Sequence, residues 1–276
     1  MSGYARPSRL SEALQILAHA PCALLAGGTD FYPSGVARPL PAQVLDITAL
    51  RELRGISAKR DHWRIGAATT WIELIEAKFP PLFDGLKRAA RKVGGEQIQN
   101  AGTIAGNLCN ASPAADSVPA LLALDAAVEL RSAGATRTLP LTEFILGARR
   151  TALRPGELVT AVLVPKPALP ASSHFLKLGA RRYLVISIVM ASAVLEHRAG
   201  KVVNARVAVG SCSPVALRLP ALEAQLEGKR FDASLAGWVT PARLAVLQPI
   251  ADVRASAEYR KLAALELVRR LLREMA

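Results

Sequence analysis

Apolar residues recur at helical spacing in several stretches of the chain. Leu10, Leu14 and Leu17 fall on one face of a helix over residues 8–20. Thr70 followed by Glu73 has the spacing of a capping box, which predicts that a helix begins there and runs to about Ala77. From such patterns we expect helices at residues 8–20, 70–77, 81–93, 118–126, 217–228 and 257–275.

Other stretches alternate between apolar and polar positions, or are short apolar runs, as β-strands are. Val203, Ala205, Val207 and Val209 alternate, so they predict one buried face of a strand. The turn at Ala133 and Gly134 separates two such runs and predicts a hairpin. We expect strands at residues 23–27, 42–47, 62–67, 127–132, 136–141, 157–165, 173–178, 184–197 and 201–210.

The order of these elements predicts an α+β protein of two domains, which a length of 276 residues also favours. The stretch 165–173 carries three prolines and two serines and is the best linker candidate. We therefore place one domain at residues 1–168, with α/β lobes at roughly 1–55 and 56–168. The second domain, residues 169–276, reads as an antiparallel sheet covered by helices.

Composition narrows the classes of function. The formal charge of +13 would suit nucleic acid, but the basic residues are scattered and no nucleic-acid-binding motif is present. An ordinary arginine-rich surface, or a surface that meets an acidic partner, is the better interpretation of this charge. No apolar run approaches the roughly 20 residues of a membrane helix, and the first residues lack the pattern of a signal peptide, so we expect a cytoplasmic protein.

The three cysteines, Cys22, Cys109 and Cys212, are far apart and never form a C-x-x-C pair. This spacing argues against a zinc site or an iron–sulfur cluster held by this chain alone. A redox role would therefore require an organic cofactor here, with any metal clusters on another chain.

Two glycine-punctuated loops carry the strongest chemical signal, LLAGGTDF at 24–31 and GTIAGN at 102–107. Glycines let a ligand approach the backbone closely, and successive N–H groups in such turns form concave sites for phosphate. Asp116, just beyond the second loop, is placed to accept hydrogen bonds from a ribose or another polyol. The alternatives are ordinary turns and a carboxylate that complements a helix dipole. Neither loop has the spacing of a GxGxxG or Walker motif.

Several sequence blocks resemble the FAD-binding medium subunit of molybdenum hydroxylases, the family of xanthine dehydrogenase and aerobic carbon monoxide dehydrogenase. These blocks are AGGTD at 26–30, IGAATT at 65–70, GTIAGN at 102–107 and ASPAADSVPALLALDA at 111–126. Residues 175–195 resemble the opening of that subunit's C-terminal domain. One departure is Ala105, where many members of the family carry a second glycine.

The resemblance implies a vanillyl-alcohol-oxidase-type (PCMH-type) FAD-binding domain, followed by a smaller domain of the CO dehydrogenase flavoprotein type. It makes the first loop and the second loop the two sites for the FAD diphosphate, and places Asp116 at the ribose or ribityl chain. Val159 would line the isoalloxazine pocket, and Lys177 would lie near the polar edge of the ring. Val93 stands where a larger side chain in the family often covers the cofactor. Lys177 could stabilise an anionic reduced flavin by its charge, or be a solvated strand lysine. The implied FAD-binding residues are Leu24, Leu25, Ala26, Gly27, Gly28, Thr29, Asp30, Phe31, Val93, Gly102, Thr103, Ile104, Ala105, Gly106, Asn107, Asp116, Val159 and Lys177.

The function that the resemblance implies is electron transfer. A large molybdopterin-binding subunit and a small [2Fe–2S] subunit would be the partners, and the external acceptor would be NAD, a quinone or oxygen. FAD would be the cofactor of this chain, with no metal and no catalytic acid or base. The alternative is a non-catalytic assembly subunit of such a complex that binds flavin weakly or not at all.

Overall fold

The chain forms two compact units in the computed structural model, which describes residues 3–35 and 42–276. Unit 1 consists of residues 1–74, 96–111 and 126–165, and unit 2 of residues 75–95, 112–125 and 166–276. Two stretches from the N-terminal half therefore pack with the C-terminal residues. The change of unit at 165–166 lies in the proline-rich stretch, whereas the domain boundary at 168–169 stays a prediction.

The first layer of unit 1 is a three-stranded parallel sheet in the order β1-β3-β2. Its elements are β1 (Gly3–Ala5), α1 (Leu10–His19), β2 (Ala23–Leu25), α2 (Phe31–Gly35) and β3 (Gln43–Asp46). Leu10, Leu14 and Leu17 of α1 are buried in one core with Leu45 of β3, as the periodicity predicts. The expected helix at 8–20 and the strands at 23–27 and 42–47 are confirmed within a few residues.

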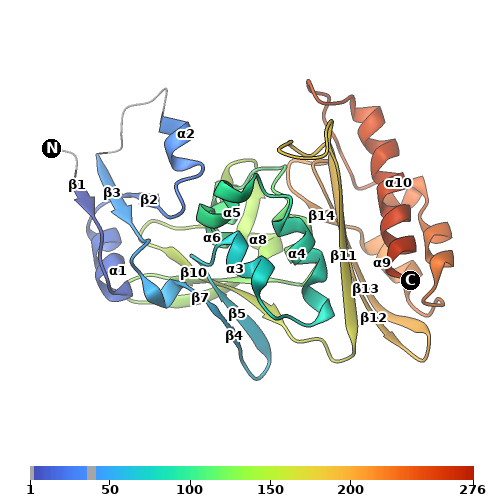
Figure 1. Ribbon diagram of the computed structural model, residues 1–276, viewed down its shortest axis with the longest axis horizontal. Coiled ribbons are helices and arrows are strands. Elements are labelled where there is room, and N and C mark those ends of the chain that lie inside the picture. Colours follow the sequence, from blue (N-terminus) through green and yellow to red (C-terminus); the bar gives the residue numbers. More distant parts are fainter. Residues whose placement is uncertain (1–2, 36–41) are drawn as a thin grey trace. The chain divides into compact units, whose positions relative to one another are not determined.

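The second sheet of unit 1 is antiparallel, in the order β4-β5-β10-β6-β7 (Figure 1). Its strands are β4 (Ile56–Ala58), β5 (His62–Gly66), β6 (Ala127–Arg131), β7 (Thr136–Pro140) and β10 (Leu158–Pro165). The predicted hairpin is the pair β6–β7. The remaining elements are α3 (Trp71–Glu76), which reaches the unit boundary, α5 (Glu96–Ala101), α6 (Ile104–Asn110), α8 (Leu141–Phe144), β8 (Ile145–Gly147), β9 (Arg150–Thr151) and a 3-10 helix at Arg51–Leu53.

Unit 2 is built on an antiparallel sheet in the order β11-β12-β13-β14, as expected for the C-terminal part. One face packs on α9 and α10 and the other on α4 (Figure 1), and α7 packs on the same sheet beside α4. Adjacent residues of β11 show the two faces: Ser173 accepts a hydrogen bond from Gly85 of α4, and His174 bonds Glu274 of α10. The elements are α4 (Asp84–Ala90), α7 (Ser117–Ala123), β11 (Ala171–Leu178), β12 (Val189–Arg198), β13 (Lys201–Gly210), β14 (Leu217–Arg218), α9 (Pro220–Leu226), α10 (Ala257–Met275) and 3-10 helices at Pro81–Phe83, Ala233–Trp238 and Pro241–Leu244.

The predicted alternation along β13 is wrong at its first position. Val203 is 46% exposed, whereas Ala205, Val207 and Val209 are buried. The register with β12 passes from Asn204 to Val202 and skips Val203, so Val203 is the extra residue of a β-bulge. The bulge reverses the faces beyond it, and Val202 takes the buried position instead.

A buried ion pair ties α7 to the sheet inside unit 2. Arg206 Nη1 lies 2.9 Å from Glu196 Oε1, and Arg206 Nε donates to the carbonyl of Ala123 at the end of α7. Both charged side chains are almost fully buried. Removing one partner of such a pair leaves the other charge buried and uncompensated.

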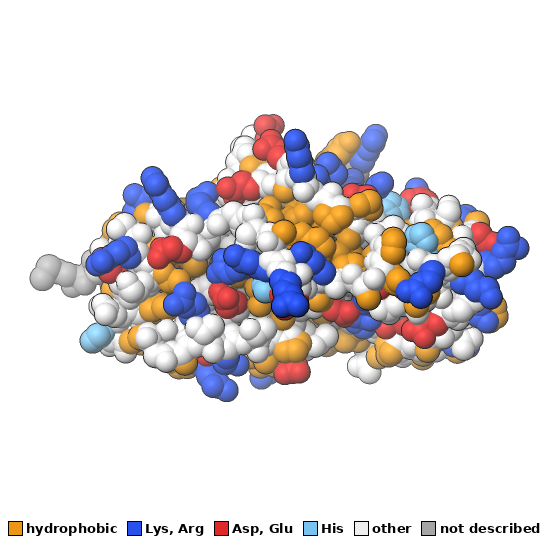
Figure 2. Space-filling view, turned by 90° about the horizontal axis from the view of Figure 1, so that it is seen from below, with side chains coloured by type: hydrophobic (Ala, Val, Ile, Leu, Met, Phe, Trp, Pro, Cys, Tyr) orange, Lys and Arg blue, Asp and Glu red, His pale blue; other side chains and the backbone are white. Residues whose placement is uncertain are grey.

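Charged residues mix on the surface. On the face in Figure 2, Lys and Arg side chains are spread over the surface with Asp and Glu among them. This distribution agrees with the scattered basic residues of the sequence. Within residues 3–35 and 42–276, none of the helices is long and apolar enough to cross a membrane.

We predict that Arg206→Met lowers the free energy of unfolding by about 3–5 kcal/mol, because Glu196 loses its buried cation. The matched control is Arg230→Met, which removes an arginine that is 83% exposed in its pair with Asp232 and should cost less than about 1 kcal/mol. Urea unfolding of the two variants measures the difference. Equal losses would show that the Arg206 pair contributes no more than a surface pair.

Candidate functional site

The segment Gly66–Thr70 is the structural centre of unit 1, because its backbone bonds to two other segments. On one side, Gly66 N donates to Gly55 O and Ala68 N to Leu53 O, both at 2.8 Å. A Cβ on Gly66 would lie against the Leu53 carbonyl, 2.6 Å from its carbon, so the close approach requires glycine. The block IGAATT is thus a backbone junction.

The other side of the same segment holds the second glycine loop. Ile104 N donates to Thr69 O at 3.0 Å, and Ala105 N donates to Ala67 O at 3.1 Å. Thr70 also forms an isolated β-bridge with Thr103. The start of the second loop is therefore fixed to the junction by backbone bonds and does not depend on a ligand for its position.

The two glycine loops meet in unit 1. A Cβ on Gly27 would lie against the Ala101 carbonyl, 2.6 Å from its carbon and 2.9 Å from the Cα of Gly102. We predicted that this glycine admits a ligand to the backbone, and the structure adds a second reason: it admits the backbone of the other loop. This contact agrees with the expectation, drawn from the resemblance, that both loops serve one FAD diphosphate.

Much of the second loop is the first turn of a helix, which the sequence reading missed. Thr103 is the N-cap of α6, and its Oγ1 accepts a hydrogen bond from Gly106 N at 3.1 Å. A Cβ on Gly106 would be 2.8 Å from that oxygen, so the glycine serves the cap. The backbone N–H of Asn107 donates to Thr103 O, so Asn107 also belongs to the first turn of the helix.

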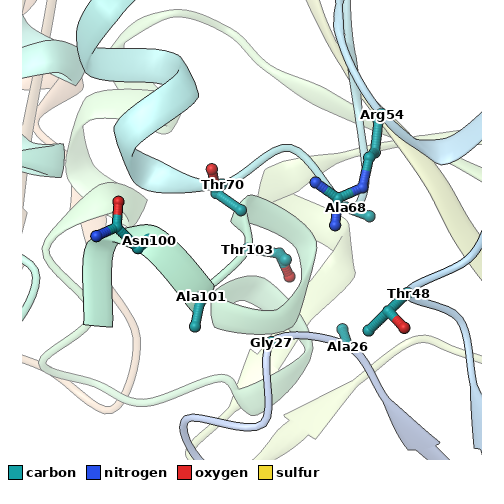
Figure 3. A pocket seen from close by; sticks show the side chains of 9 residues that line it. All are labelled: Ala26, Gly27, Thr48, Arg54, Ala68, Thr70, Asn100, Ala101 and Thr103. Atoms are coloured by element: carbon teal, nitrogen blue, oxygen red, sulfur yellow. The ribbon is translucent and has the colours of Figure 1, made fainter. Parts of the chain in front are cut away.

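A pocket of about 210 Å³ opens where the two loops and the junction meet (Figure 3). Arg54 is its one charged lining residue among those that the structure describes, and hydroxyl and amide side chains supply other polar groups. The volume is below the roughly 300–1,000 Å³ typical of pockets for whole drug-sized ligands. The pocket therefore suits a polar part of a larger ligand. Its lining is Ala26, Gly27, Thr48, Arg54, Ala68, Thr70, Asn100, Ala101 and Thr103.

The sequence reading had named Ala26, Gly27 and Thr103 of this lining and missed the rest. Arg54 gave no motif signal, because a lone arginine after a short turn looks like a surface residue. Thr70 had been given a capping role, and that role is confirmed: its N–H and hydroxyl both bond the Glu73 carboxylate.

The remaining predicted residues of unit 1 lie around the pocket lining or beyond it. Leu25, Ile104, Ala105 and Val159 are buried, and Gly28 has a left-handed backbone with φ of 72°. Their contacts with a cofactor stay predictions, as do those of Leu24, Thr29, Asp30, Phe31, Gly102, Gly106 and Asn107.

Within unit 2 the structure joins two of the predicted residues. Lys177 Nζ lies 2.6 Å from Asp116 Oδ2, and Ser187 Oγ donates to Asp116 Oδ1 at 2.6 Å. Burial raises the pKa of Asp116, while the Lys177 ammonium and the Ser187 hydroxyl act in the opposite direction. Asp116 occupies the N-cap of α7, yet its side chain makes no capping bond, so the simple helix-dipole reading is not the whole explanation.

Lys177 is almost fully buried in this pair, so it is no solvated strand lysine. Its ammonium also donates to the carbonyl of Lys92, next to the half-buried Val93. The roles of Asp116, Lys177 and Val93 toward a cofactor stay predictions.

These features define a class: an α+β protein with a polar, cation-bearing pocket between two glycine loops, and a second unit with a helix-covered antiparallel sheet. Residues 1–167 match the family of the FAD binding domain in molybdopterin dehydrogenase. Residues 174–275 match the CO dehydrogenase flavoprotein C-terminal domain. The chain belongs to this family of FAD-binding oxidoreductase subunits, and FAD is the cofactor of its N-terminal domain.

Known proteins agree with this assignment. The chain is 31% identical over 264 residues to the xanthine dehydrogenase FAD-binding subunit of Escherichia coli O157:H7, covering 94% of this chain and 90% of that one. It is 38% identical over 191 residues to the nicotinate dehydrogenase FAD-subunit of Eubacterium barkeri, covering 66% of this chain and 64% of that one. A chain of the reconstituted CO dehydrogenase from Oligotropha carboxidovorans superposes with a TM-score of 0.90 at 28% identity, covering 100% of this chain and 99% of that chain.

We predict that Gly27→Ala weakens FAD binding by about tenfold or more, because its Cβ would push the first loop away from Ala101. Overpacking of this kind costs about 1–3 kcal/mol, and 1.4 kcal/mol is tenfold in affinity. Fluorescence titration of the apoprotein with FAD measures the change. The control is Gly134→Ala, whose Cβ meets nothing within 4 Å. FAD affinity equal in the two variants would contradict the role of Gly27.

The cysteines give a second prediction. Burial raises the pKa of Cys109 and that of Cys212 to about 12, so both stay thiols at pH 8. We expect slow alkylation of both by iodoacetamide in the folded protein and rapid alkylation after unfolding in urea. Mass spectrometry of the peptides reads out each site. Cys109 that reacts equally fast in both states would contradict this.

Proposed function

We propose that the chain is the FAD-carrying electron-transfer subunit of a molybdopterin-dependent hydroxylase or dehydrogenase. In this function, electrons pass from [2Fe–2S] centres of a partner subunit through FAD to an external acceptor such as NAD, a quinone or oxygen. The observation that carries the proposal is the polar pocket formed where the two glycine loops meet. The relatives from Eubacterium barkeri and Escherichia coli are both FAD subunits of larger dehydrogenases, which supports assembly with other chains.

The residues of the pocket fit the diphosphate of FAD. Its lining has one guanidinium, the hydroxyls of Thr48 and Thr103 and an amide, whereas the Thr70 hydroxyl already donates to Glu73, whose carboxylate is not part of the lining. FAD, when bound, supplies the redox chemistry, and the protein supplies binding and orientation. The junction at Gly66–Thr70 gives that orientation, because it fixes the backbone on both sides of the pocket before any ligand binds.

No residue of this chain is assigned an acid–base step. Cys109 and Cys212 stay protonated thiols near neutral pH, so neither is a ready nucleophile. The substrate of the whole complex is chosen on a partner subunit in this proposal, which is why the pocket described here needs only to recognise a cofactor.

The test uses the chain together with its partner subunits, before and after removal of FAD. We expect about one FAD per chain by absorbance after acid release. Without FAD, substrate should still reduce the iron–sulfur centres, while transfer to the external acceptor stops and returns when FAD is restored. A complex that contains no flavin yet keeps full transfer to the acceptor would favour the assembly-subunit alternative.

A further inference from the structure

Arg54 supplies positive charge to the pocket without a close ionic partner. Among the described residues it forms an ion pair with Glu73, at 3.8 Å between Nη1 and Oε1, which exceeds hydrogen-bond distance. Both side chains are about two-fifths exposed. Figure 3 shows the guanidinium directed into the space bounded by Thr70, Thr103 and Thr48.

The backbone around Arg54 is held tightly although its side chain is not. The carbonyl of Leu53 accepts from Ala68 N, and the carbonyl of Gly55 accepts from Gly66 N. Arg54 N itself donates to Arg51 O at 3.0 Å. The residues on both sides of Arg54 are thus bonded to the junction, which positions a long cationic side chain at the pocket with a fixed Cα.

The carboxylate of Glu73 already accepts hydrogen bonds from Thr70. Its Oε2 accepts from the N–H of Thr70 at 2.6 Å and from the Thr70 hydroxyl at 2.9 Å, which caps the start of α3. The cap holds this carboxylate at the edge of the pocket, where it balances the charge of Arg54 loosely. A ligand anion that reaches hydrogen-bond distance of Arg54 would replace this weak attraction with a stronger one.

Other groups around the pocket complete a set of donors. The Thr103 oxygen accepts from Gly106 N, so its own hydroxyl proton is left to donate. Asn100 brings an amide with two N–H donors. A guanidinium and a hydroxyl at one small space are suited to the oxygens of a diphosphate, and the planar guanidinium can bind two of them at once.

We propose that Arg54 recognises the diphosphate of the dinucleotide, and that Glu73 is the competing anion that the diphosphate displaces. This inference rests on the proposed function for its ligand, FAD. It assigns the phosphate selectivity of the pocket to one side chain outside both glycine loops.

The experiment measures the dissociation constants of FAD, riboflavin and ADP for the apoprotein by titration. ADP carries the diphosphate without the flavin, and riboflavin carries the flavin without phosphate. The variants are Arg54→Met, Arg54→Lys and Glu73→Gln, which keeps an oxygen for the α3 cap. Arg51→Met is the matched control, because Arg51 is exposed, lies three residues away and does not line the pocket.

We expect Arg54→Met to weaken FAD and ADP by roughly 10- to 100-fold, the range of a hydrogen bond to a charged group. Riboflavin binding should stay within about twofold of wild type, because riboflavin has no diphosphate for Arg54 to bind. Damage to the fold would instead weaken the binding of all three ligands. The affinity of Arg54→Lys for FAD and ADP should fall between those of wild type and Arg54→Met. Lysine keeps the positive charge but lacks the planar guanidinium that can bind two oxygens at once. Glu73→Gln should tighten FAD and ADP, and Arg51→Met should change neither.

Two results would overturn the inference: Arg54→Met with unchanged FAD and ADP affinity, or with equal losses for FAD and riboflavin. A wild-type protein that binds ADP but not FAD would overturn the proposed function instead, while loss of ADP binding in Arg54→Met would still support the role of Arg54. If wild type binds neither FAD nor ADP, both fail.

Discussion

Backbone contact between segments far apart in sequence is the constraint on which the site depends. The junction at Gly66–Thr70 bonds residues 53–55 on one side and residues 104–105 on the other. Gly27 then closes against Ala101, so four stretches of chain meet within one unit. The approaches at Gly66 and Gly27 are too close for a side chain at the glycine, and all three contacts restrict the backbone and so fix the position of the pocket lining.

This arrangement explains why the pocket can be polar and still have a defined shape. A diphosphate site made of mobile side chains would lose affinity to the entropy of ordering them. Here the threonines are tied in place by secondary structure: Thr103 caps α6, and Thr70 caps α3. Both caps stabilise their helices, and the α6 cap also fixes the Thr103 hydroxyl at the pocket, whereas the Thr70 hydroxyl is directed to Glu73.

The sequence predicted much of this and missed identifiable parts. Periodicity found α1, α10 and nearly every long strand, because each has one apolar face and tertiary packing supports it. It missed α5 and α6, since Gly102 and Gly106 look like turn residues until the Thr103 cap is known. Arg54 was missed because its position at the pocket depends on the hydrogen bonds that the carbonyls of Leu53 and Gly55 accept from the junction. No spacing in the sequence encodes those bonds. The bulge at Val203 was missed because an inserted residue leaves the alternation intact in the sequence and breaks it only in the register.

Arg54 and Lys177 differ in how far a neighbouring carboxylate neutralises their positive charge. Lys177 is bonded at 2.6 Å to Asp116, and both are almost fully buried, so the pair presents a dipole with little net charge. Electrostatic stabilisation of an anion requires a cation whose charge is not already neutralised. Arg54 meets that condition, because its carboxylate partner lies 3.8 Å away and is occupied by a helix cap. The buried pair is better suited to holding the Asp116 oxygens in one orientation, with Ser187 on the second oxygen. The two cations thus differ in what their surroundings allow: Arg54, in unit 1, has charge left to attract an anion, as we propose, whereas Lys177, in unit 2, holds a carboxylate.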